Sequence, residues 1–500
     1  MKYLLTLLTI TCIGLCNVSA QSKTELLSFE NLGGSGYDRI YKLTPTIDGG
    51  FLASIPTNSN SGKLDFSCTR SDRMVYRKYD VNGLYTNQWC KIIRYEGEAI
   101  NTFLLSSGNI LQLSQMDPNR YSGRQRLLIE RETITGNQLL RKEMGPEKDI
   151  CVINDMIALT DGNFLIASTV RVPGGDVIYT LADTGKKSNN IWLTKIDTNA
   201  KLIWQKIIGG SNAEWFTHLA QAPDNGYYVA ALSRSSDWDC KCAGVNTELF
   251  ISRLDSVGNI LWSRCLGSGE KDVVLGDIVE DGTGGVYIAA TARGNGKDLQ
   301  GVHIGKEDFW IVHLDKNNNL KLSKCYGSAG GIENAYGIAV SKDRTIWVYG
   351  GAIKDNGEPH GKDGMIDTGY GATDAWVINI DSTGKLLYSK ILGTTNGDNA
   401  LDIYALRDSS VVVAGMYSSP QAGGNFPNIY EGGMYDGFIA RFGTPKPNNV
   451  ISEGAKLQNN IHLYPNPVED KLYIKNTAQQ NSRIQISDIN GRAVSDIIIK

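Results

Sequence analysis

Short runs of alternating hydrophobic and polar residues, joined by a polar turn and closed by glycine, recur along the chain. In the clearest copy, residues 249–254 (LFISRL) lead through a turn at residues 255–258 to a second run that carries Trp262 and ends at Gly267. Alternation with a period of two around an Asp-x-x-Gly turn predicts a β-hairpin. Similar copies lie at residues 75–93, 127–145, 192–210, 309–327 and 375–393, with half a copy at 436–443.

Two further apolar segments precede each hairpin. Residues 218–222 and 227–232, separated by Asp224-Asn225-Gly226, are one example. This predicts four strands in each unit, and glycine turns about 48 to 66 residues apart mark a repeat architecture. Four strands per unit is typical of a β-propeller blade, so we expect an all-β, seven-bladed β-propeller. The glycine turns that define the units lie near Gly34, Gly97, Gly145, Gly210, Gly267, Gly327 and Gly393.

The last unit ends at Phe442-Gly443 after its third strand, whereas residues 25–34 resemble a fourth strand without a hairpin before it. We therefore expect residues 27–32 to pair with residues 438–442 and close the ring, which hides both exposed edges. Counted back from the glycines, Phe29 falls one position away from Trp204, and the second unit is weakly marked. Rings of six or eight blades are the alternatives.

The recurring turn residues have local explanations. The aspartate of each hairpin turn is suited to accept backbone N–H bonds, and the glycine or asparagine three residues later tolerates a positive φ. Trp89, Trp204, Trp262 and Tyr388 follow these turns, and we expect them to pack between neighbouring blades.

The N-terminus has the features of a signal peptide. Lys2 supplies a positive charge, residues 4–15 an apolar segment, and residues 18–20 (VSA) a cleavage site. The apolar run is too short to cross a bilayer, so we expect no transmembrane segment after cleavage. A lipoprotein site at Cys16 is the weaker alternative, because Leu15 stands where a small residue is wanted.

Net charge is −3, without a dense basic run, so we expect no nucleic-acid partner. An exported chain permits disulfides, but the cysteines beyond the leader are odd in number. Cys240 and Cys242 lack the further ligands that zinc sites have. We expect Cys265 and Cys325 to be small core residues, because Ile207 and Ile391 occupy the same place in other repeats.

The expected domains are a signal peptide (1–20), a β-propeller (21–443), a linker rich in Pro, Asn, Gly and Lys (444–460), and a small sandwich-like β domain (461–500). The last segment contains the motif Tyr-Pro465-Asn466-Pro467, then Asp470, and later Asp-Ile-Asn-Gly491-Arg492.

These two motifs resemble the type A C-terminal sorting domain of the bacterial type IX secretion system. Members of that family pass the inner membrane by the Sec route and the outer membrane through the type IX machinery. They are then released or attached to the cell surface. The resemblance implies a secreted or outer-membrane surface protein. The chain stops at Lys500, before the Gly-x-Tyr-x-Val segment that the family usually has, so we expect an incomplete copy.

The repeats also resemble uncharacterised propellers that precede such tails, through residues 204–211 and 48–51. Two enzyme-like propeller families fit poorly. The hairpin turn is one residue shorter than the docking motif of quinoprotein dehydrogenases, and no vicinal cysteine pair is present. The sialidase box Ser-x-Asp-x-Gly-x-Thr-Trp is also missing, as are zinc-helix, nucleophile-elbow and phosphate-loop motifs. We expect no cofactor and assign no catalytic residue.

An acidic residue recurs near most glycine turns. The simpler interpretation is a turn-stabilising acceptor, and the sharper one is an acidic ring at one mouth of the channel. Such a ring would suit a cationic ligand or Ca²⁺, although no metal-loop spacing supports it. The six residues are Asp38, Asp149, Glu214, Asp272, Glu333 and Asp398.

Long variable segments join the second strand to the third in six units, and in a propeller these emerge on one face. Binding residues concentrate on variable loops held by a rigid scaffold. The aromatic and histidine residues expected on this long-loop face are Trp238, His303, His360, Tyr370 and Tyr430.

These patterns favour a secreted or cell-surface binding protein with a glycan or protein ligand on the long-loop face. The alternative is a secreted hydrolase or lyase that degrades a polysaccharide or peptide at the channel mouth, for which two carboxylates in one pocket would be the sign. A structural component of the cell surface is the third interpretation.

Overall fold

The computed structural model describes most of residues 24–445 and four strands of the C-terminal region. The gaps are residues 60, 65–72, 93–98, 117–124, 148, 179–187, 243–245, 270, 300–304, 329–330, 354–368, 419–423 and 427–431. Beyond residue 445, the described residues are 461–464, 473–476, 482–487 and 493–499. The chain divides into two compact units, Met1–Thr444 and Pro445–Lys500.

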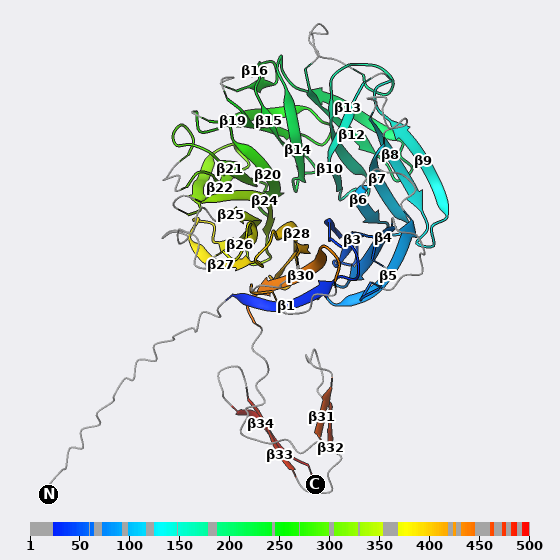
Figure 1. The fold of residues 1–500 in the computed structure, drawn as a ribbon, viewed down its shortest axis with the longest axis vertical. Coiled ribbons are helices and arrows are strands. Elements are labelled where there is room, and N and C mark those ends of the chain that lie inside the picture. The colour runs from blue at the N-terminus through cyan, green and yellow to red at the C-terminus, as the bar shows by residue number, and fades with distance from the viewer. Residues whose placement is uncertain are drawn as a thin grey trace, which may run out of the picture. The chain divides into compact units, whose positions relative to one another are not determined.

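The first unit is a ring of seven four-stranded antiparallel sheets, which confirms the expected seven-bladed β-propeller (Figure 1). Blade 1 comprises β2 (Lys42–Pro45), β3 (Phe51–Thr57), β4 (Arg73–Tyr79) and β5 (Tyr85–Ile92). Blade 2 comprises β6 (Ala99–Leu104), β7 (Ile110–Met116), β8 (Arg126–Glu132) and β9 (Gln138–Met144). Blade 3 comprises β10 (Cys151–Ala158), β11 (Phe164–Val170), β12 (Asn190–Ile196) and β13 (Leu202–Ile208).

The remaining blades repeat this order. Blade 4 comprises β14 (Glu214–Gln221), β15 (Tyr227–Ser233), β18 (Glu248–Leu254) and β19 (Ile260–Leu266), with an added hairpin of β16 (Ser236–Asp237) and β17 (Cys240–Lys241). Blade 5 comprises β20 (Val274–Glu280), β21 (Val286–Ala292), β22 (Asp308–Leu314) and β23 (Leu320–Tyr326). Blade 6 comprises β24 (Ile332–Val340), β25 (Ile346–Ile353), β26 (Asp374–Ile380) and β27 (Leu386–Leu392). Blade 7 comprises β28 (Asn399–Ala405), β29 (Val411–Tyr417), β30 (Asp436–Gly443) and β1 (Glu25–Leu32).

The N-terminal strand β1 closes the ring as the outer strand of blade 7. Its residues pair with β30 from Leu26 opposite Phe442 to Leu32 opposite Gly437, with a bulge between Leu26 and Ser28. The one-position offset of Phe29 noted in the sequence is therefore real. The Phe29 ring packs against Tyr417, Phe426 and Phe438 of the same blade.

The second and third strands of the blades are buried on both faces. Every residue of β11, β12, β15, β18, β21 and β26 is buried. A middle strand of a propeller blade packs against a neighbouring blade on each side, so it reads as a nearly continuous apolar run instead of an alternating one. The cores accordingly lie between blades, as in the cluster that joins β15 and β18 to β21 and β22.

Tryptophans in the third strand are satisfied by a polar residue of the fourth strand. The indole N–H of Trp192 donates to Gln205 (2.8 Å), that of Trp310 to Ser323 (2.9 Å), and that of Trp376 to Ser389 (3.0 Å). A buried indole N–H needs such a partner. In blade 7 the same place in the third strand holds Phe438, which has no donor to satisfy.

The Asp-x-x-Gly hairpins have the expected geometry. In Asp80, Asp197, Asp255, Asp315 and Asp381, Oδ1 accepts the backbone N–H groups two and four residues later. The residue three positions after the aspartate has a positive φ, for example 89° at Gly258 and 55° at Ala200. These turns confirm the Asx-type prediction.

In three blades the fourth strand also ties the blade to the next hairpin. Lys142 Nζ donates to the carbonyl oxygen of Ala200 (2.7 Å), Arg264 Nη1 to that of Asn318 (2.9 Å), and Lys324 Nζ to that of Gly384 (2.8 Å). Each acceptor is the positive-φ residue of the following blade's turn. A cation at this position of the fourth strand thus links blades 2, 4 and 5 to the blades that follow them.

The four aromatic residues lie at junctions between blades, as expected. Trp204 packs against Tyr227 of the next blade, and Tyr388 against Phe442 of the next blade. Trp89 and Trp262 contact Tyr76 and Tyr228 of their own blades, and they pack against clusters that include Ile110 of blade 2 and Trp310 of blade 5.

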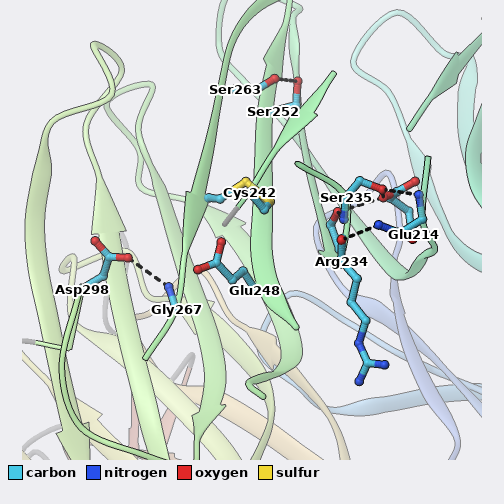
Figure 2. Close-up of a disulfide and its surroundings, with 12 residues drawn as sticks. Glu214, Arg234, Ser235, Cys242, Glu248, Ser252, Ser263, Gly267 and Asp298 are labelled. Carbon is cyan, nitrogen blue, oxygen red and sulfur yellow. Dashed lines mark hydrogen bonds between the residues drawn. A yellow bond between two sulfur atoms is a disulfide. The ribbon is translucent and has the colours of Figure 1, made fainter. Parts of the chain in front are cut away.

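The loops between second and third strands clasp the preceding blade. The Gly267 N–H donates to Asp298 Oδ2 (3.0 Å), and the Asp298 N–H donates to the Gly267 carbonyl (3.2 Å). Asp176 and Asp239 make the same pair of bonds to Gly145 and Gly209. Figure 2 shows the Gly267 clasp beside blade 4.

In blade 4 the clasping loop is also fixed by a disulfide between Cys242 and Cys265 of β19 (Figure 2). The expectation that Cys265 is an unpaired core residue was therefore wrong. The position is shared with Ile207 of blade 3 and with Cys90 of blade 1, and the cysteine pairs where another cysteine comes within reach of it. Cys325 is buried and unpaired, as expected. Cys90 is disulfide-bonded as well.

The described part of the second unit is entirely β. It contains one hairpin of β31 (Ile461–Tyr464) with β32 (Tyr473–Asn476) and another of β33 (Ser482–Ser487) with β34 (Ala493–Ile499). No helix in the described parts of the chain has the length and apolar character needed to cross a membrane.

Removal of residues 24–32 should destabilise the propeller severely. The deletion leaves β30 as an open edge of the sheet. It also removes the Asn31 Nδ2 donor (3.1 Å) of the buried Asp436 carboxylate. We expect a lower melting temperature and aggregation in size-exclusion chromatography. A deletion of residues 446–500 is the control and should leave the melting temperature of the propeller unchanged. Equal stability of both deletions would contradict closure by β1.

The Cys242→Ser/Cys265→Ser double variant should unfold more easily. The disulfide closes a loop with a sequence separation of 23 residues, for which chain entropy predicts about 3 kcal/mol. Denaturant unfolding of the wild-type and variant proteins, both without reductant, measures this difference. A variant as stable as the wild-type protein would show that the Asp239 clasp holds the loop unaided.

Candidate functional site

Four of the six recurring acidic residues occupy equivalent positions at the start of an inner strand. The backbone N–H groups of Asp38, Glu214, Glu333 and Asp398 each donate to the residue that precedes the third strand of the neighbouring sheet, and all four side chains are buried. Hydroxyl groups surround them. Asp38 accepts bonds from Thr57 and Ser59, and Glu214 accepts from Ser233 (2.8 Å) and Ser235 (2.6 Å). Figure 2 shows the Glu214 contact.

The two other acidic residues lie differently. The equivalent position holds Cys151 in blade 3 and Val273 in blade 5. Asp149 stands two residues before Cys151, and Asp272 stands one residue before Val273. Asp149 pairs with Arg171 (2.6 Å), and Asp272 accepts the Thr247 N–H (2.6 Å) and pairs with Arg234 (3.3 Å). All six therefore act as acceptors for groups of their own or the adjoining blade, and the proposal that they bind a cation or Ca²⁺ stays a prediction.

Burial raises the pKa of Glu214 to about 7, of Glu333 to about 8 and of Asp398 to about 6, despite the donors that lower it. The negative charge of Asp308 in the preceding blade adds to the effect on Glu333, and Asp374 does the same to Asp398. The same crowding explains the glycines of the repeat. A Cβ on Gly327 would lie 2.0 Å from Asp308 Oδ1 and 2.8 Å from Glu333 Oε2.

The structure describes two of the five residues expected on the long-loop face. Trp238 lies in the turn of the added hairpin and is half-buried, and Tyr370 has 38% of its surface exposed. His303, His360 and Tyr430 lie outside the described residues. So do all the sorting-motif residues, namely Pro465, Asn466, Pro467, Asp470, Gly491 and Arg492.

Within the described residues, one group of His, Cys, Asp or Glu side chains has metal-site dimensions, namely Cys242, Glu248 and Cys265. Its two sulfur atoms are joined in the disulfide. A thiolate is needed to bind a metal, so this group is not suited to one.

The structure reveals a set of polar residues that the sequence reasoning missed. In each blade, one inner-strand residue pairs with the fourth residue of the second strand. In six blades a bulge immediately precedes it, and bulges redirect side chains. We call these seven residues the channel ring. They are Lys42, Asn101, Asp155, His218, Asp277, Gly337 and Asp402.

Neighbouring members of the channel ring are linked around the axis. Lys42 Nζ lies 3.5 Å from Asp402 Oδ2, and His218 Nδ1 lies 3.2 Å from Asp277 Oδ1. Asp155 Oδ2 accepts the Leu219 N–H (3.0 Å). These contacts hold adjacent blades together, and they also fix the positions of the charges in the channel.

The charges within the channel ring shift one another. The negative charge of Asp402 raises the pKa of Lys42, so this amine stays protonated. Burial lowers the pKa of His218, but the hydrogen bond and charge of Asp277 and the charge of Asp155 outweigh it and raise the pKa overall. Burial raises the pKa of Asp402, although the charge of Lys42 opposes this. The ring contains three carboxyl groups against one amine and one imidazole, so its formal charge is negative.

The channel ring borders a cavity of about 610 Å³. Most of the lining residues follow the ring residues along the inner strands, so the cavity lies in the half of the channel nearer the short turns. Its walls include Tyr41, Phe103, Tyr336, Tyr349 and Tyr404. The cavity therefore combines aromatic walls with a charged, polar border, which is typical of sites for small ligands.

A sequence signal for the channel ring was available. Each ring residue stands six positions before the polar turn between the first two strands, as Asp155 does before Asp161 and His218 before Asp224. Aligning the repeats on that turn brings the seven residues into one column. Counting from the glycine turns hides this column, because an extra bulge residue in blade 4 shifts the register of its inner strand.

The comparison with protein families confirms the tail. Residues 462–500 match the family described as "Secretion system C-terminal sorting domain". The chain thus joins a seven-bladed β-propeller to a C-terminal region that matches a secretion-system sorting domain. A domain of this kind directs its protein to secretion and to the cell surface or outer membrane.

No curated protein matches the chain, whereas many solved structures show a distant likeness to it. A puromycin hydrolase structure has 12% identity and a TM-score of 0.45 over 77% of this chain, which spans only 51% of that protein. The phage phi92 endosialidase has 10% identity and a TM-score of 0.41, over 95% of this chain and 79% of that one. YCF48 from Cyanidioschyzon merolae has 11% identity and a TM-score of 0.42, over 83% and 98%. No function follows from likenesses this distant.

Stability should fall as pH rises above about 5. Folding raises the pKa values of Glu214, Glu333 and Asp398, so the native state holds protons that the unfolded chain has already released. We expect the melting temperature to drop by several degrees between pH 5.5 and 8.5, as measured by differential scanning fluorimetry. Glu333→Gln should flatten this dependence, because the amide cannot ionise. The exposed Glu143→Gln variant should keep the wild-type slope, and a flat wild-type profile would contradict the assignment.

Proposed function

We propose that this protein is an exported binding protein that holds a small, amine-bearing, hydroxyl-rich ligand, of the amino-sugar type, in the central cavity. The net negative channel ring at the border of the 610 Å³ cavity carries this proposal. Carboxylates attract an ammonium group and accept bonds from hydroxyls, and tyrosine faces stack against sugar rings. The match to a secretion-system sorting domain supports a site outside the cell, where a sugar ligand could reach it.

The site differs from the long-loop face that the sequence favoured. Side chains from all seven inner strands converge on the cavity, and rigid strands position groups better than loops do. The long-loop face stays a second candidate surface for ligand binding, because it carries Trp238 and Tyr370.

A hydrolase that acts in the same cavity is the second candidate. The His218 and Asp277 pair favours it, because a carboxylate that orients an imidazole is the usual arrangement of a general base. The cavity contains no serine or cysteine among its described lining residues, so such an enzyme would activate water directly.

Chitosan and chitin tetramers form a matched pair of probes, because acetylation removes the charge and leaves the sugar rings. We expect the full chain to bind the chitosan tetramer at pH 6 at least tenfold more tightly than the chitin tetramer, measured by isothermal titration calorimetry. Asp155→Asn should weaken chitosan binding severalfold, because it removes a ring charge but keeps an acceptor for the Leu219 N–H. Glu143→Gln on the outer strand β9 is the control.

Equal affinity for both tetramers, or no effect of Asp155→Asn, would contradict the proposal. Release of shorter sugars during the titration, lost in His218→Gln, would favour the hydrolase instead.

A further inference from the structure

A second cavity, of about 350 Å³, lies against the outer strand of blade 4, apart from the channel. One wall is the added hairpin with Trp238, Asp239 and Lys241. The other wall is β19, from Ile260 to Cys265. We refer to it as the hairpin pocket. Blade 4 is the one blade whose second-to-third-strand loop forms a two-stranded hairpin within the described residues.

Trp238 has a backbone conformation that an aromatic residue rarely adopts. Its φ is 52°, in the left-handed region, where bulky side chains are strained. The equivalent positions, immediately before the clasping aspartates of blades 3 and 5, hold Gly175 (φ 60°) and Lys297 (φ 47°). The turn therefore accepts glycine without loss, and a tryptophan there needs a reason other than the fold.

The hairpin that carries Trp238 is held from both sides. The Asp239 clasp ties it to Gly209 of blade 3, and the disulfide of Cys242 with Cys265 ties its base to β19. This anchoring fixes the indole relative to the groups on β19, and a fixed aromatic binds with less loss of conformational entropy.

One lysine without a partner borders the hairpin pocket. The Lys241 side chain lines it and has no partner among the described residues. The Arg264 side chain lies on the other face of β19, because side chains alternate along a strand and Cys265 faces the hairpin, and its Nη1 donates to Asn318 of blade 5. Lys206 acts electrostatically on Asp239, the single carboxylate of the lining. The Asp239 carboxylate accepts the Gly209 N–H (3.3 Å).

We propose that the hairpin pocket binds an acidic sugar unit, with the sugar ring stacked on Trp238 and its anionic group paired with Lys241. A planar indole beside a cationic donor fits a pyranose that carries a carboxylate or a sulfate. This site is separate from the channel, has the opposite charge preference and does not depend on the function proposed there.

The test uses the full chain with a galacturonate hexamer, a sulfated hexasaccharide and neutral cellohexaose, by isothermal titration calorimetry. We expect at least one of the two acidic oligomers to bind, and neutral cellohexaose to bind at least tenfold more weakly. Added salt should weaken the complexes with the acidic oligomers. The two acidic probes show whether carboxylate or sulfate is preferred.

Trp238→Gly separates binding from folding. We expect this variant to lose at least tenfold in affinity for the acidic oligomer, yet to melt at the same temperature as wild type or about 2 °C higher, because glycine relieves the strained φ. Lys241→Gln should weaken binding about threefold to tenfold and reduce its salt dependence. Lys201→Gln, an exposed lysine in the hairpin of blade 3, is the control and should change neither.

Three results would overturn the inference. They are no binding of either acidic oligomer at millimolar concentration, equal binding of cellohexaose, and unchanged affinity in Trp238→Gly. A lower melting temperature in Trp238→Gly would show that the indole serves the fold, which also counts against the site. Chitosan binding in the channel should be the same in all these variants, so the two sites fail or succeed separately.

Discussion

The pairing of the first strand with the last sheet is the constraint on which the whole molecule depends. A blade of this protein has no core of its own, because its middle strands bury both faces against neighbours. Each blade is therefore stable only while both neighbours stay in place, and the chain can satisfy that condition for blade 7 only by returning its N-terminus to β30. Closure turns seven marginal sheets into one cooperative structure.

The junctions between blades explain most of the repeat pattern. Buried carboxylates of adjacent blades crowd the turn until no Cβ fits, so glycine stands there. In three blades a lysine or arginine of the fourth strand reaches the next hairpin. Acidic and basic residues that look like candidates for binding in the sequence are therefore largely occupied by contacts between blades.

The sequence predicts the architecture well because the strands and turns of a propeller blade depend on residues that are close together in the chain. Alternation, Asx turns and glycine positions gave the strands, the blade number and the closing pair. The Cys242 to Cys265 disulfide was missed because it depends on how one loop folds back onto β19, which no local pattern reports. The channel ring was missed because convergence on an axis is a property of the closed ring, and its members Lys42, Asn101, His218 and Gly337 share a position but no chemistry.

The channel ring combines a constant backbone position with a variable side chain. Its backbone position is the same in every blade, because each member pairs with the fourth residue of the second strand, and in six blades a bulge precedes it. The side chain at this position varies from glycine to lysine. Exchanging a single such side chain therefore changes the electrostatic potential inside the channel while the backbone pairing within each blade is kept.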